Sequence, residues 1–470
     1  MTLKTNDEKL YDELMLVLKL FYTKEEIETA KNIISHTIDI DYENITNTIT
    51  INGKKCHTFS RVDKSNERIK NNPYKYYKRY SKLLLYKALS SVTHKKLPWG
   101  SLTGIRPTKL LYELAREENS LDIATNRLIK EFYVSKEKAK VAKEIIQNQN
   151  ISKDDKIIDF YINIPFCPTR CKYCSFVSGG LKECGHLIPA YLDTLKYEVK
   201  KSLDFIKENS YKIKTIYIGG GTPTSLTAEQ LDQLLSIIDI EVSEFTVESG
   251  RPDTITKEKL DVLQKHNVTR ICINPQTFSD DTLQKIGRGH TTQQTYDAYA
   301  IARKYPFMIN MDLIAGLENE DFNTFKASLN QAITLNPDNI TVHTLSVKKA
   351  SRLIETKHEL QNAKLVEKMT RYSYKQLNKH NYRPYYLYKQ KNMIGNLENI
   401  GYFRGNSICE FNIDSMEECA SIFACGANAI SKRYWKDTDR IERWANVKNI
   451  NEYVNRIDEM LKNKFDLFIK

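Results

Sequence analysis

Three cysteines in one short segment restrict this chain more than any other feature. Cys167, Cys171 and Cys174 follow an extended apolar run, at spacings of four and three residues. A cubane [4Fe–4S] cluster normally takes four thiolates, and a structural zinc site takes four Cys or His ligands. Cys184 and His186 are the nearest further candidates, and they lack a second pair at the spacing of a zinc ribbon or finger. Three thiolates would leave one iron open to bind another molecule, so we predict such a cluster rather than a degenerate zinc site or incidental cysteines.

The composition indicates a multidomain protein without a membrane span. A chain of 470 residues exceeds what one hydrophobic core usually supports, so we expect two or three domains. No apolar run approaches the roughly 18 residues of a membrane-spanning helix, and the charged start, from Lys4 to Lys9, is unlike a secretory signal. Nine cysteines, an odd number, favour reduced thiols and metal binding over disulfides. The sequence therefore predicts a cytoplasmic protein.

The net charge of +12 leaves two explanations open. A polyanionic partner would account for it, either a nucleic acid or a substrate rich in carboxylates. However, lysine is spread along the whole chain without a dense run, which favours a general solubility or compositional cause.

Residues 1–150 are typical of a separate α+β domain of uncertain role. The apolar segments 45–51 and 56–59 predict a hairpin, because Asn52-Gly53 between them supplies the positive φ that a tight turn requires. A mainly helical stretch begins near Tyr74, and two segments containing Gly and Pro interrupt it, 97–100 and 104–109.

From Lys156 onward, short apolar strands alternate with amphipathic helices. We expect strands near 157–164, 214–219, 244–249, 269–274, 308–314 and 339–345. We expect helices between them near 187–207, 227–238, 256–266, 292–304 and 321–335. Such an alternation implies βαβ units and a parallel sheet. It fits an incomplete (β/α)6 barrel over residues 151–350, although the periodicity also permits a doubly wound sheet.

Unusual residues fall one after another at the carboxyl ends of the predicted strands, and this favours the barrel. They are the three cysteines, Gly220, Gly221, Thr222, Glu248, Gln276, Arg288 and Asp312. Any one of them alone would more often be an ordinary cap or a satisfied polar group. Together at one edge, they predict a cofactor pocket.

The cysteine motif, with an aromatic residue before its last cysteine, resembles that of the radical S-adenosylmethionine (SAM) superfamily. The wider constellation, over residues 156–435, resembles the oxygen-independent coproporphyrinogen III oxidase (dehydrogenase) family. Segments between Tyr386 and Gly401, together with those near residue 100, are similar to its HemZ-type branch. The resemblance implies an N-terminal α+β domain, a radical SAM barrel and a C-terminal substrate-covering region over 351–470.

The resemblance also implies residue roles. Cys167, Cys171 and Cys174 would hold the [4Fe–4S] cluster, and Tyr161 would pack near the sulfonium of SAM as a catalytic residue. The SAM site would further comprise Tyr173, Gly220, Gly221, Thr222, Glu248, Gln276, Arg288, Asp312, Ser346 and Ile430. Glu248 and Asp312 suit hydrogen bonds from amino or ribose hydroxyl groups, and Arg288 suits a carboxylate.

The implied activity is radical oxidative decarboxylation in porphyrin and haem biosynthesis. Hydrogen is removed from a propionate side chain, CO2 is lost and a vinyl group remains, with electrons supplied by a donor such as ferredoxin or flavodoxin. Two positions depart from the well-characterised oxidases: Phe176 stands where they have a further cysteine, and Asn163 where they have a histidine. The SAM half of the site is therefore better supported than the substrate half.

Aromatic and cationic side chains are dense in the C-terminal region. They are Tyr372, Tyr374, Tyr382, Tyr385, Tyr386, Tyr388, Tyr402 and Phe403, with Arg383, Lys389, Lys391 and Arg404. They would suit a flat tetrapyrrole bearing carboxylates, a packed core, or RNA bases. His290 and His343 are expected to be scaffold residues, and Cys409, Cys419 and Cys425 structural ones.

Two alternative functions remain open at this point. A haem-binding or trafficking protein of the same family would keep the fold without decarboxylating anything. An RNA-modifying radical SAM enzyme would explain the positive charge, but we find no recognisable RNA-binding motif, so a nucleic-acid partner is not expected.

Overall fold

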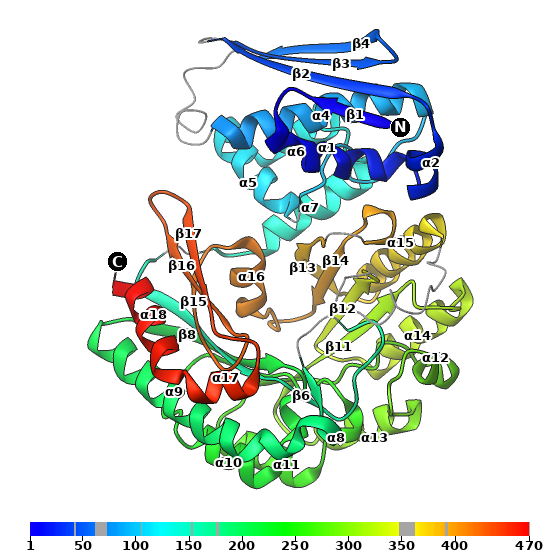
Figure 1. Cartoon of the computed structure of the whole chain (residues 1–470). Coiled ribbons are helices and arrows are strands. Elements are labelled where there is room, and N and C mark those ends of the chain that lie inside the picture. The colour runs from blue at the N-terminus through cyan, green and yellow to red at the C-terminus, as the bar shows by residue number, and fades with distance from the viewer. Residues whose placement is uncertain are drawn as a thin grey trace. The chain divides into compact units, whose positions relative to one another are not determined.

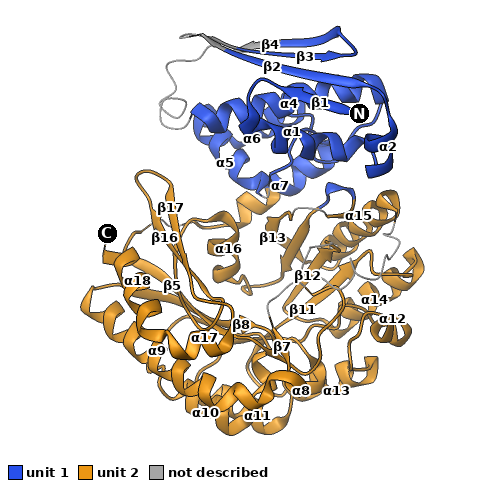
Figure 2. Cartoon of the chain, viewed as in Figure 1, with its two compact units in different colours: residues 1–143, 395–397 blue, residues 144–394, 398–470 orange. Residues whose placement is uncertain are grey.

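The computed structural model describes residues 1–41, 44–61, 73–104, 106–151, 154–174, 178–346, 362–390 and 393–469. The chain forms two compact units (Figure 2), one of residues 1–143 with 395–397 and the other of residues 144–394 with 398–470. The expected boundary near residue 150 lies close to this division. The expected C-terminal region, in contrast, belongs almost entirely to the same unit as the barrel.

The first unit packs helices onto a four-stranded sheet of order β1-β2-β3-β4. The strands are β1 (Thr2–Thr5), β2 (Ile33–Asp41), β3 (Asn44–Ile51) and β4 (Lys54–Arg61). The helices are α1 (Glu8–Phe21), α2 (Lys24–Thr29), α4 (Pro73–Thr93), α5 (Pro107–Glu118), α6 (Leu121–Lys130) and α7 (Lys136–Asn148), whose last turn lies in the second unit. The predicted hairpin is confirmed, since Asn52 and Gly53 join β3 to β4 with φ of +52° and +79°.

The segment 97–100 has a packing role within the first unit. Trp99 is completely buried, and Gly100 has a left-handed φ of +51°. A Cβ atom at Gly100 would lie 2.2 Å from the carbonyl oxygen of Phe132, so only glycine fits this position.

The second unit contains an open sheet of order β13-β14-β12-β11-β10-β9-β8-β5-β15-β16-β17. Its central strands are β5 (Ile157–Ile164), β8 (Lys212–Gly220), β9 (Glu244–Val247), β10 (Arg270–Cys272), β11 (Met308–Ala315) and β12 (Asn339–Thr344). These six strands are parallel to one another, and each corresponds to a predicted strand. The incomplete barrel is therefore confirmed.

Helices cover the outer face of this sheet (Figure 1). The predicted ones are present as α9 (Ile188–Glu208), α10 (Ala228–Leu235), α11 (Lys257–Lys265), α13 (Thr292–Ala302) and α14 (Phe322–Leu335). The short helices α8 (Leu181–Cys184) and α12 (Asp280–Lys285) were not expected. Along each strand, alternate residues face these helices. On β8, for example, Ile216 and Ile218 join the outer core, while Tyr217 faces the interior.

The C-terminal residues extend the sheet at both edges. Beyond β12 lie β14 (Asn399–Phe403) and β13 (Arg383–Tyr388), both antiparallel, preceded by α15 (Ala363–Lys379). Beyond β5 lie β15 (Ser421–Cys425), which is parallel to it, and then the antiparallel β16 (Ile430–Trp435) and β17 (Arg440–Ala445). The chain ends in α17 (Ile450–Asn455) and α18 (Ile457–Ile469).

Helix α16 (Glu410–Glu417) lies on the inner side of the curved sheet (Figure 1). The carboxylate of Glu244, at the start of β9, accepts hydrogen bonds from the backbone N–H groups of Glu410 and Phe411 at 2.7 and 3.1 Å. Lys214, near the start of β8, forms an ion pair with Asp414 at 2.6 Å. This helix therefore closes the amino-terminal end of the barrel interior, the end opposite the cysteine loop.

Within the described residues, no helix combines the length and the apolar character needed to cross a membrane.

Candidate active site

The inner face of the sheet surrounds one cavity of about 380 Å³. It receives side chains from every strand between β5 and β12, and from the C-terminal segments. Nearly all of the predicted site residues line it, namely Tyr161, Cys167, Cys171, Tyr173, Cys174, Gly220, Gly221, Thr222, Glu248, Gln276, Arg288, Asp312 and Ser346. The fold thus brings together residues that are up to 185 positions apart in the sequence.

Ile430 is the exception among the predicted site residues. It is the first residue of β16, is 50% exposed and does not line the cavity. Its pairing with Ala445 of β17 sets the face toward which its side chain points. Ile430 thus lies outside the wall of this cavity, and its role as a neighbour of SAM stays a prediction.

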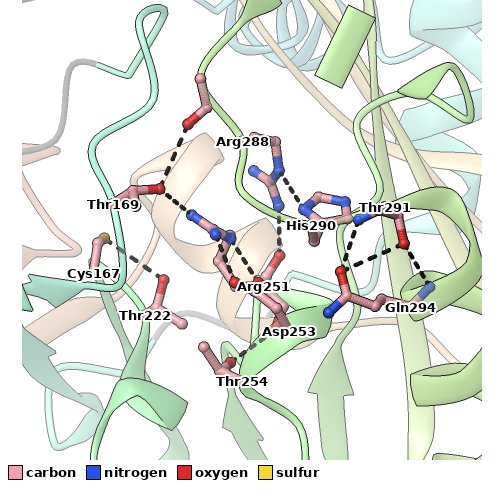
Figure 3. Close-up of polar contacts among 12 residues, drawn as sticks. Cys167, Thr169, Thr222, Arg251, Asp253, Thr254, Arg288, His290, Thr291 and Gln294 are labelled. Atoms are coloured by element: carbon pink, nitrogen blue, oxygen red, sulfur yellow. Dashed lines mark hydrogen bonds and ion pairs between the residues drawn. The ribbon is translucent and has the colours of Figure 1, made fainter. Parts of the chain in front are cut away.

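The cysteine loop begins at the end of the first barrel strand. Cys167 ends the short strand β6 (Phe166–Cys167), which pairs with β7 (Gly179–Gly180). The hydroxyl of Thr222 donates a hydrogen bond to Cys167 Sγ at 3.6 Å (Figure 3). The backbone N–H of Thr222 also donates to the carbonyl oxygen of Phe166 at 2.7 Å. The loop after β8 therefore holds the first cysteine in place.

Two glycines make this close approach possible. Gly220 has a φ of +109°, and a Cβ there would lie 2.2 Å from Asn163 Oδ1. A Cβ at Gly221 would lie 2.5 Å from the carbonyl oxygen of Phe166 and 2.9 Å from Cys167 Sγ. A side chain at Gly221 would therefore displace the cysteine loop, and one at Gly220 would displace Asn163 of β5.

The residues that line the cavity fit a cluster with a small polar molecule beside it. Among the described residues, no three His, Cys, Asp or Glu side chains converge on a single metal-ion position. A cluster is held through separate irons, so its three thiolates need not converge in that way. In addition, Asn274 Oδ1 and Gln276 Oε1 are buried in the cavity wall and have no hydrogen-bond partner in the described part of the chain. A polar ligand in the cavity would supply the missing hydrogen bonds.

Gln276 also has a strained backbone, with a φ of +66°. The bridge that it forms with Leu313 of β11 holds it in place. Such strain at a buried polar residue is typical of binding sites.

Arg288 is buried and joins several loops around the cavity (Figure 3). Its guanidinium donates to the hydroxyl of Tyr173 at 2.7 Å, and to the carbonyl oxygens of Gly250 and Asn274 at 2.9 and 2.7 Å. Its Nε donates to His290 Nδ1 at 3.4 Å. Burial, with Arg288 nearby, lowers the pKa of His290 to about 3, so this histidine is neutral. Arg288 therefore positions Tyr173 within the cysteine loop, and most of its donors are already used.

Arg251 forms a second link to the cysteine loop (Figure 3). Its Nη1 donates to the hydroxyl of Thr169 at 2.9 Å, while Nε and Nη2 bind both carboxylate oxygens of Asp253 at 2.8 and 2.7 Å. Arg251 as a whole residue is only 3% exposed. The paired carboxylate of Asp253 balances the charge of its guanidinium.

Two partly buried carboxylates in the cavity have opposite pKa shifts. Burial and repulsion by Asp312 raise the pKa of Glu248 to about 7. Burial would also raise the pKa of Asp312, but attraction to His343, with hydrogen bonds from His343 and Asn310, outweighs it and lowers that pKa. His343 Nε2 lies 3.4 Å from Asp312 Oδ2. Near neutral pH, the cavity thus contains one ionised carboxylate and one that titrates.

Aromatic rings form much of the cavity wall. Tyr161, Tyr217 and Phe411 stack on one another, with ring centroids 4.3 to 6.2 Å apart. Of the C-terminal aromatic residues, Tyr385, Tyr386 and Tyr388 line the cavity. The others are not among its lining residues, and Lys391 lies outside the described residues.

Several lining residues were not anticipated from the sequence. His343 and Cys409 were expected to be scaffold residues, whereas Thr246, Arg270 and Asn274 were not considered at all. Thr246 and Arg270 face the interior because they alternate with the outer-core residues Phe245, Val247 and Ile271. This alternation within short, mostly apolar strands was the available signal.

Asn163 is one of the two departures from the oxidase pattern, and it lies within the described residues. The side-chain amide of Asn163 donates to the carbonyl oxygen of Ala427 at 2.7 Å, and its Oδ1 accepts from the Tyr161 hydroxyl at 3.1 Å. Asn163 therefore ties β5 to the segment after β15. Phe176 lies outside the described residues.

Comparison with known proteins agrees with this geometry. A model of the radical SAM superfamily matches residues 161–332. The fold is similar to the solved structure of the radical SAM enzyme coproporphyrinogen III oxidase HemN from Escherichia coli, with a TM-score of 0.52 and 19% identity over 66% of this chain and 71% of that one. The fold and the site thus define a radical SAM protein, a class that uses a [4Fe–4S] cluster and SAM.

Sequence similarity extends over nearly the full length. The chain is 38% identical to the oxygen-independent coproporphyrinogen-III oxidase-like protein HemZ of Bacillus subtilis, over 99% of this chain and 97% of that protein. It is 37% identical to the heme chaperone HemW of the same organism, over 40% of this chain and 50% of that protein. The chain belongs to the oxygen-independent coproporphyrinogen-III oxidase-like family of HemZ.

Proposed function

We propose that this radical SAM enzyme oxidatively decarboxylates the propionate side chains of coproporphyrinogen III to vinyl groups. Each conversion removes one hydrogen atom, one CO2 and one electron from a propionate, and the electron passes to an acceptor. The observation that carries the proposal is the similarity to the HemZ protein, which extends through both compact units. The aromatic cavity wall supports it, because aromatic side chains pack well against the pyrrole rings of such a substrate.

We assign the cofactors to the part of the cavity that lies at the carboxyl ends of the strands. Cys167, Cys171 and Cys174 would hold the cluster, with SAM beside Tyr173, Gly220, Gly221, Thr222, Glu248, Gln276, Asp312 and Ser346. When bound, these cofactors supply the group that abstracts hydrogen. A small electron carrier such as ferredoxin or flavodoxin would reduce the cluster, and we place this reaction in the cytoplasm.

The protein's own residues orient the reactants and keep water away. Arg288 and Arg251 fix the cysteine loop through Tyr173 and Thr169. Tyr161, which is buried among Tyr217 and Phe411, presents an apolar ring beside the cofactor position. His343 holds the Asp312 carboxylate in its ionised form, ready to accept a hydrogen bond. Such positioning supplies a large part of catalysis when two reactants must meet in a fixed geometry.

A second candidate function is haem binding and delivery without decarboxylation. The similarity to the heme chaperone HemW over the barrel favours it. So does Asn163, which stands where the oxidases have a histidine and has a structural role here.

One anaerobic experiment separates the two functions. Reconstituted, reduced protein is incubated with SAM and coproporphyrinogen III, and the products are analysed by mass spectrometry. We expect 5′-deoxyadenosine together with a tetrapyrrole lighter by one or two CO2. If 5′-deoxyadenosine forms while the tetrapyrrole is unchanged, the substrate is wrong. Haem binding by protein with an intact cluster, with neither product formed, would favour the chaperone function.

A further inference from the structure

Two polar atoms without partners lie side by side on the inner face of the barrel. Thr246 Oγ1 and Arg270 Nε are buried, and neither has a hydrogen-bond partner among the described residues. The two residues are direct partners on the parallel strands β9 and β10, so their side chains point to the same face. Both line the cavity.

The guanidinium of Arg270 is held rigidly, and the carboxylate of Glu244 attracts it without forming an ion pair. Arg270 is 3% exposed, its Nη1 donates to Asn339 Oδ1, and its Nη2 donates to the carbonyl oxygen of Ile408 at 2.9 Å. In the described part of the chain, no carboxylate forms an ion pair with it. The nearby Glu244 uses its oxygens to accept from the N–H groups that open α16 and from the thiol of Cys409. A buried cation without an ion pair is unfavourable by itself and favours binding of an anion.

The same row of the sheet provides an aromatic surface next to these atoms. Tyr161 pairs with Tyr217, and Tyr217 pairs with Thr246, so the row runs Tyr161, Tyr217, Thr246, Arg270 across four adjacent strands. The rings of Tyr161 and Tyr217 lie 6.2 Å apart at an interplanar angle of 21°. Phe411 stacks on Tyr217 at 4.3 Å, so a pyrrole ring would pack against the remaining surface of these side chains and present a substituent to Thr246 and Arg270.

A carboxylate matches the two unpaired donors. It has two oxygens that only accept hydrogen bonds, and Arg270 Nε–H and the Thr246 hydroxyl can each donate to one of them. Hydrogen bonds between a guanidinium and a carboxylate are among the strongest in proteins.

We propose that Thr246 and Arg270 bind a carboxylate of the tetrapyrrole substrate that does not react, while the ring system rests on Tyr161 and Tyr217. Arg270 precedes Asn274 by four residues along the chain, a span of about 13 Å in an extended strand. The anchored carboxylate would therefore lie well away from the cofactor end of the cavity. This inference rests on the proposed function, because it concerns the substrate of that reaction.

The test measures binding rather than turnover. Protein is titrated anaerobically with coproporphyrin III, the stable oxidised form of coproporphyrinogen III. Quenching of the porphyrin fluorescence gives the dissociation constant. The Arg270→Met substitution is expected to weaken binding by about 10- to 100-fold, and Thr246→Val by roughly 5-fold. Arg270→Lys keeps the charge but removes the Nε–H group, and it should give an intermediate loss. The tetramethyl ester of coproporphyrin III, which has no carboxylate, should bind all variants equally.

Arg433→Met is the matched control. Arg433 is also buried, and its Nε also lacks a partner among the described residues, but it does not line the cavity. We expect this variant to bind coproporphyrin III as the unmodified protein does. Melting temperature and SAM affinity identify any variant whose fold is damaged, and Thr246→Val and Arg270→Lys remain informative if Arg270→Met does not fold.

The outcomes separate this inference from the proposed function. Equal affinities of the unmodified protein and the Arg270 and Thr246 variants would overturn the inference, while decarboxylation would stand. Weaker binding by these variants in a protein that never decarboxylates would support the carboxylate anchor and reject the oxidase. If the unmodified protein does not bind coproporphyrin III, the inference falls, while the assay with coproporphyrinogen III still decides the proposed function.

Discussion

Glu248 and Asp312 show how neighbouring side chains set the charge of the cavity. Both are acidic and both are partly buried, yet the pKa of Glu248 is raised to about 7, while that of Asp312 is lowered. The difference arises because His343 lies beside Asp312, at 3.4 Å. Near neutral pH, a small change in pH therefore alters the charge of one carboxylate and leaves the other ionised.

This difference predicts a pH dependence of SAM binding. If the ionised form of Glu248 accepts hydrogen bonds from SAM, affinity should increase as the pH rises through about 7, because the ionised fraction rises with it. The expected change is up to about tenfold between about pH 6 and about pH 8. Isothermal titration of the reconstituted protein with SAM, for the unmodified protein and the Glu248→Gln variant, would measure it. The variant should bind more weakly, and this pH dependence should be absent.

Glu320 offers the control for this experiment. Burial also raises its pKa to about 7, but it does not line the cavity. Because both folded-state pKa values exceed that of an unfolded glutamate, both residues reduce stability as the pH rises from about 4.5 to about 7. Glu320→Gln should therefore lessen the loss of melting temperature over this range without changing the pH dependence of SAM affinity. A pH dependence that persists in Glu248→Gln would contradict the role assigned to Glu248.

At Gly221, even a substitution by alanine should have a large effect on the cluster. A Cβ there would lie 2.9 Å from Cys167 Sγ and 2.5 Å from a backbone oxygen. We expect Gly221→Ala to lose most of its iron after reconstitution and to be destabilised by about 1 to 3 kcal/mol. Iron analysis and the visible absorbance of the cluster measure the first effect. Gly185→Ala is the control, because its Cβ would meet nothing closer than 4.0 Å. Full iron content in Gly221→Ala would show that the loop adapts.

Among the helices, α18 is attached to the barrel by a buried ion pair. Lys464 of α18 and Glu198 of α9 are both completely buried, with Nζ and Oε1 2.7 Å apart. Glu198 also accepts hydrogen bonds from the Tyr453 hydroxyl at 2.6 Å and from the Asn446 amide at 2.8 Å. These contacts join the last helices and the segment after β17 to α9. The C-terminal residues are therefore part of the barrel unit.

Removing one partner of this ion pair should be strongly destabilising. Lys464→Met leaves the Glu198 carboxylate buried without its cation, and we expect a loss of about 3 to 5 kcal/mol. Denaturation followed by circular dichroism would measure the loss. Lys462→Met, at an exposed position of the same helix, should change stability little. Similar stabilities for the two variants would mean that Glu198 becomes protonated or hydrated at little cost.

At the scale of the whole chain, the two compact units suggest that the second unit alone binds the cofactors. Every residue that lines the cavity lies between Tyr161 and Met416, and therefore in the second unit. A chain that begins at residue 144 should consequently bind its cluster and SAM as the complete protein does. Iron content, SAM affinity and circular dichroism would test this. A folded truncated chain without iron would show that the first unit contributes to the cofactor site.

The sequence alone determined a large part of this protein. The spacing of Cys167, Cys171 and Cys174 indicated the cluster, and the alternation of apolar strands with amphipathic helices indicated the barrel. Both signals are local, since each depends on residues close together in the chain. For the same reason, the Asn52-Gly53 turn was placed correctly.

Only the tertiary structure decided which distant side chains meet. The pairing of β9 with β10 places Thr246 beside Arg270, and the pairing of β11 with β12 brings His343 to Asp312. Likewise, the pairing of β16 fixed the exposed position of Ile430, which a motif match could not reveal. Strand order and register depend on contacts between residues far apart in the sequence, whereas a motif records only residue type and spacing.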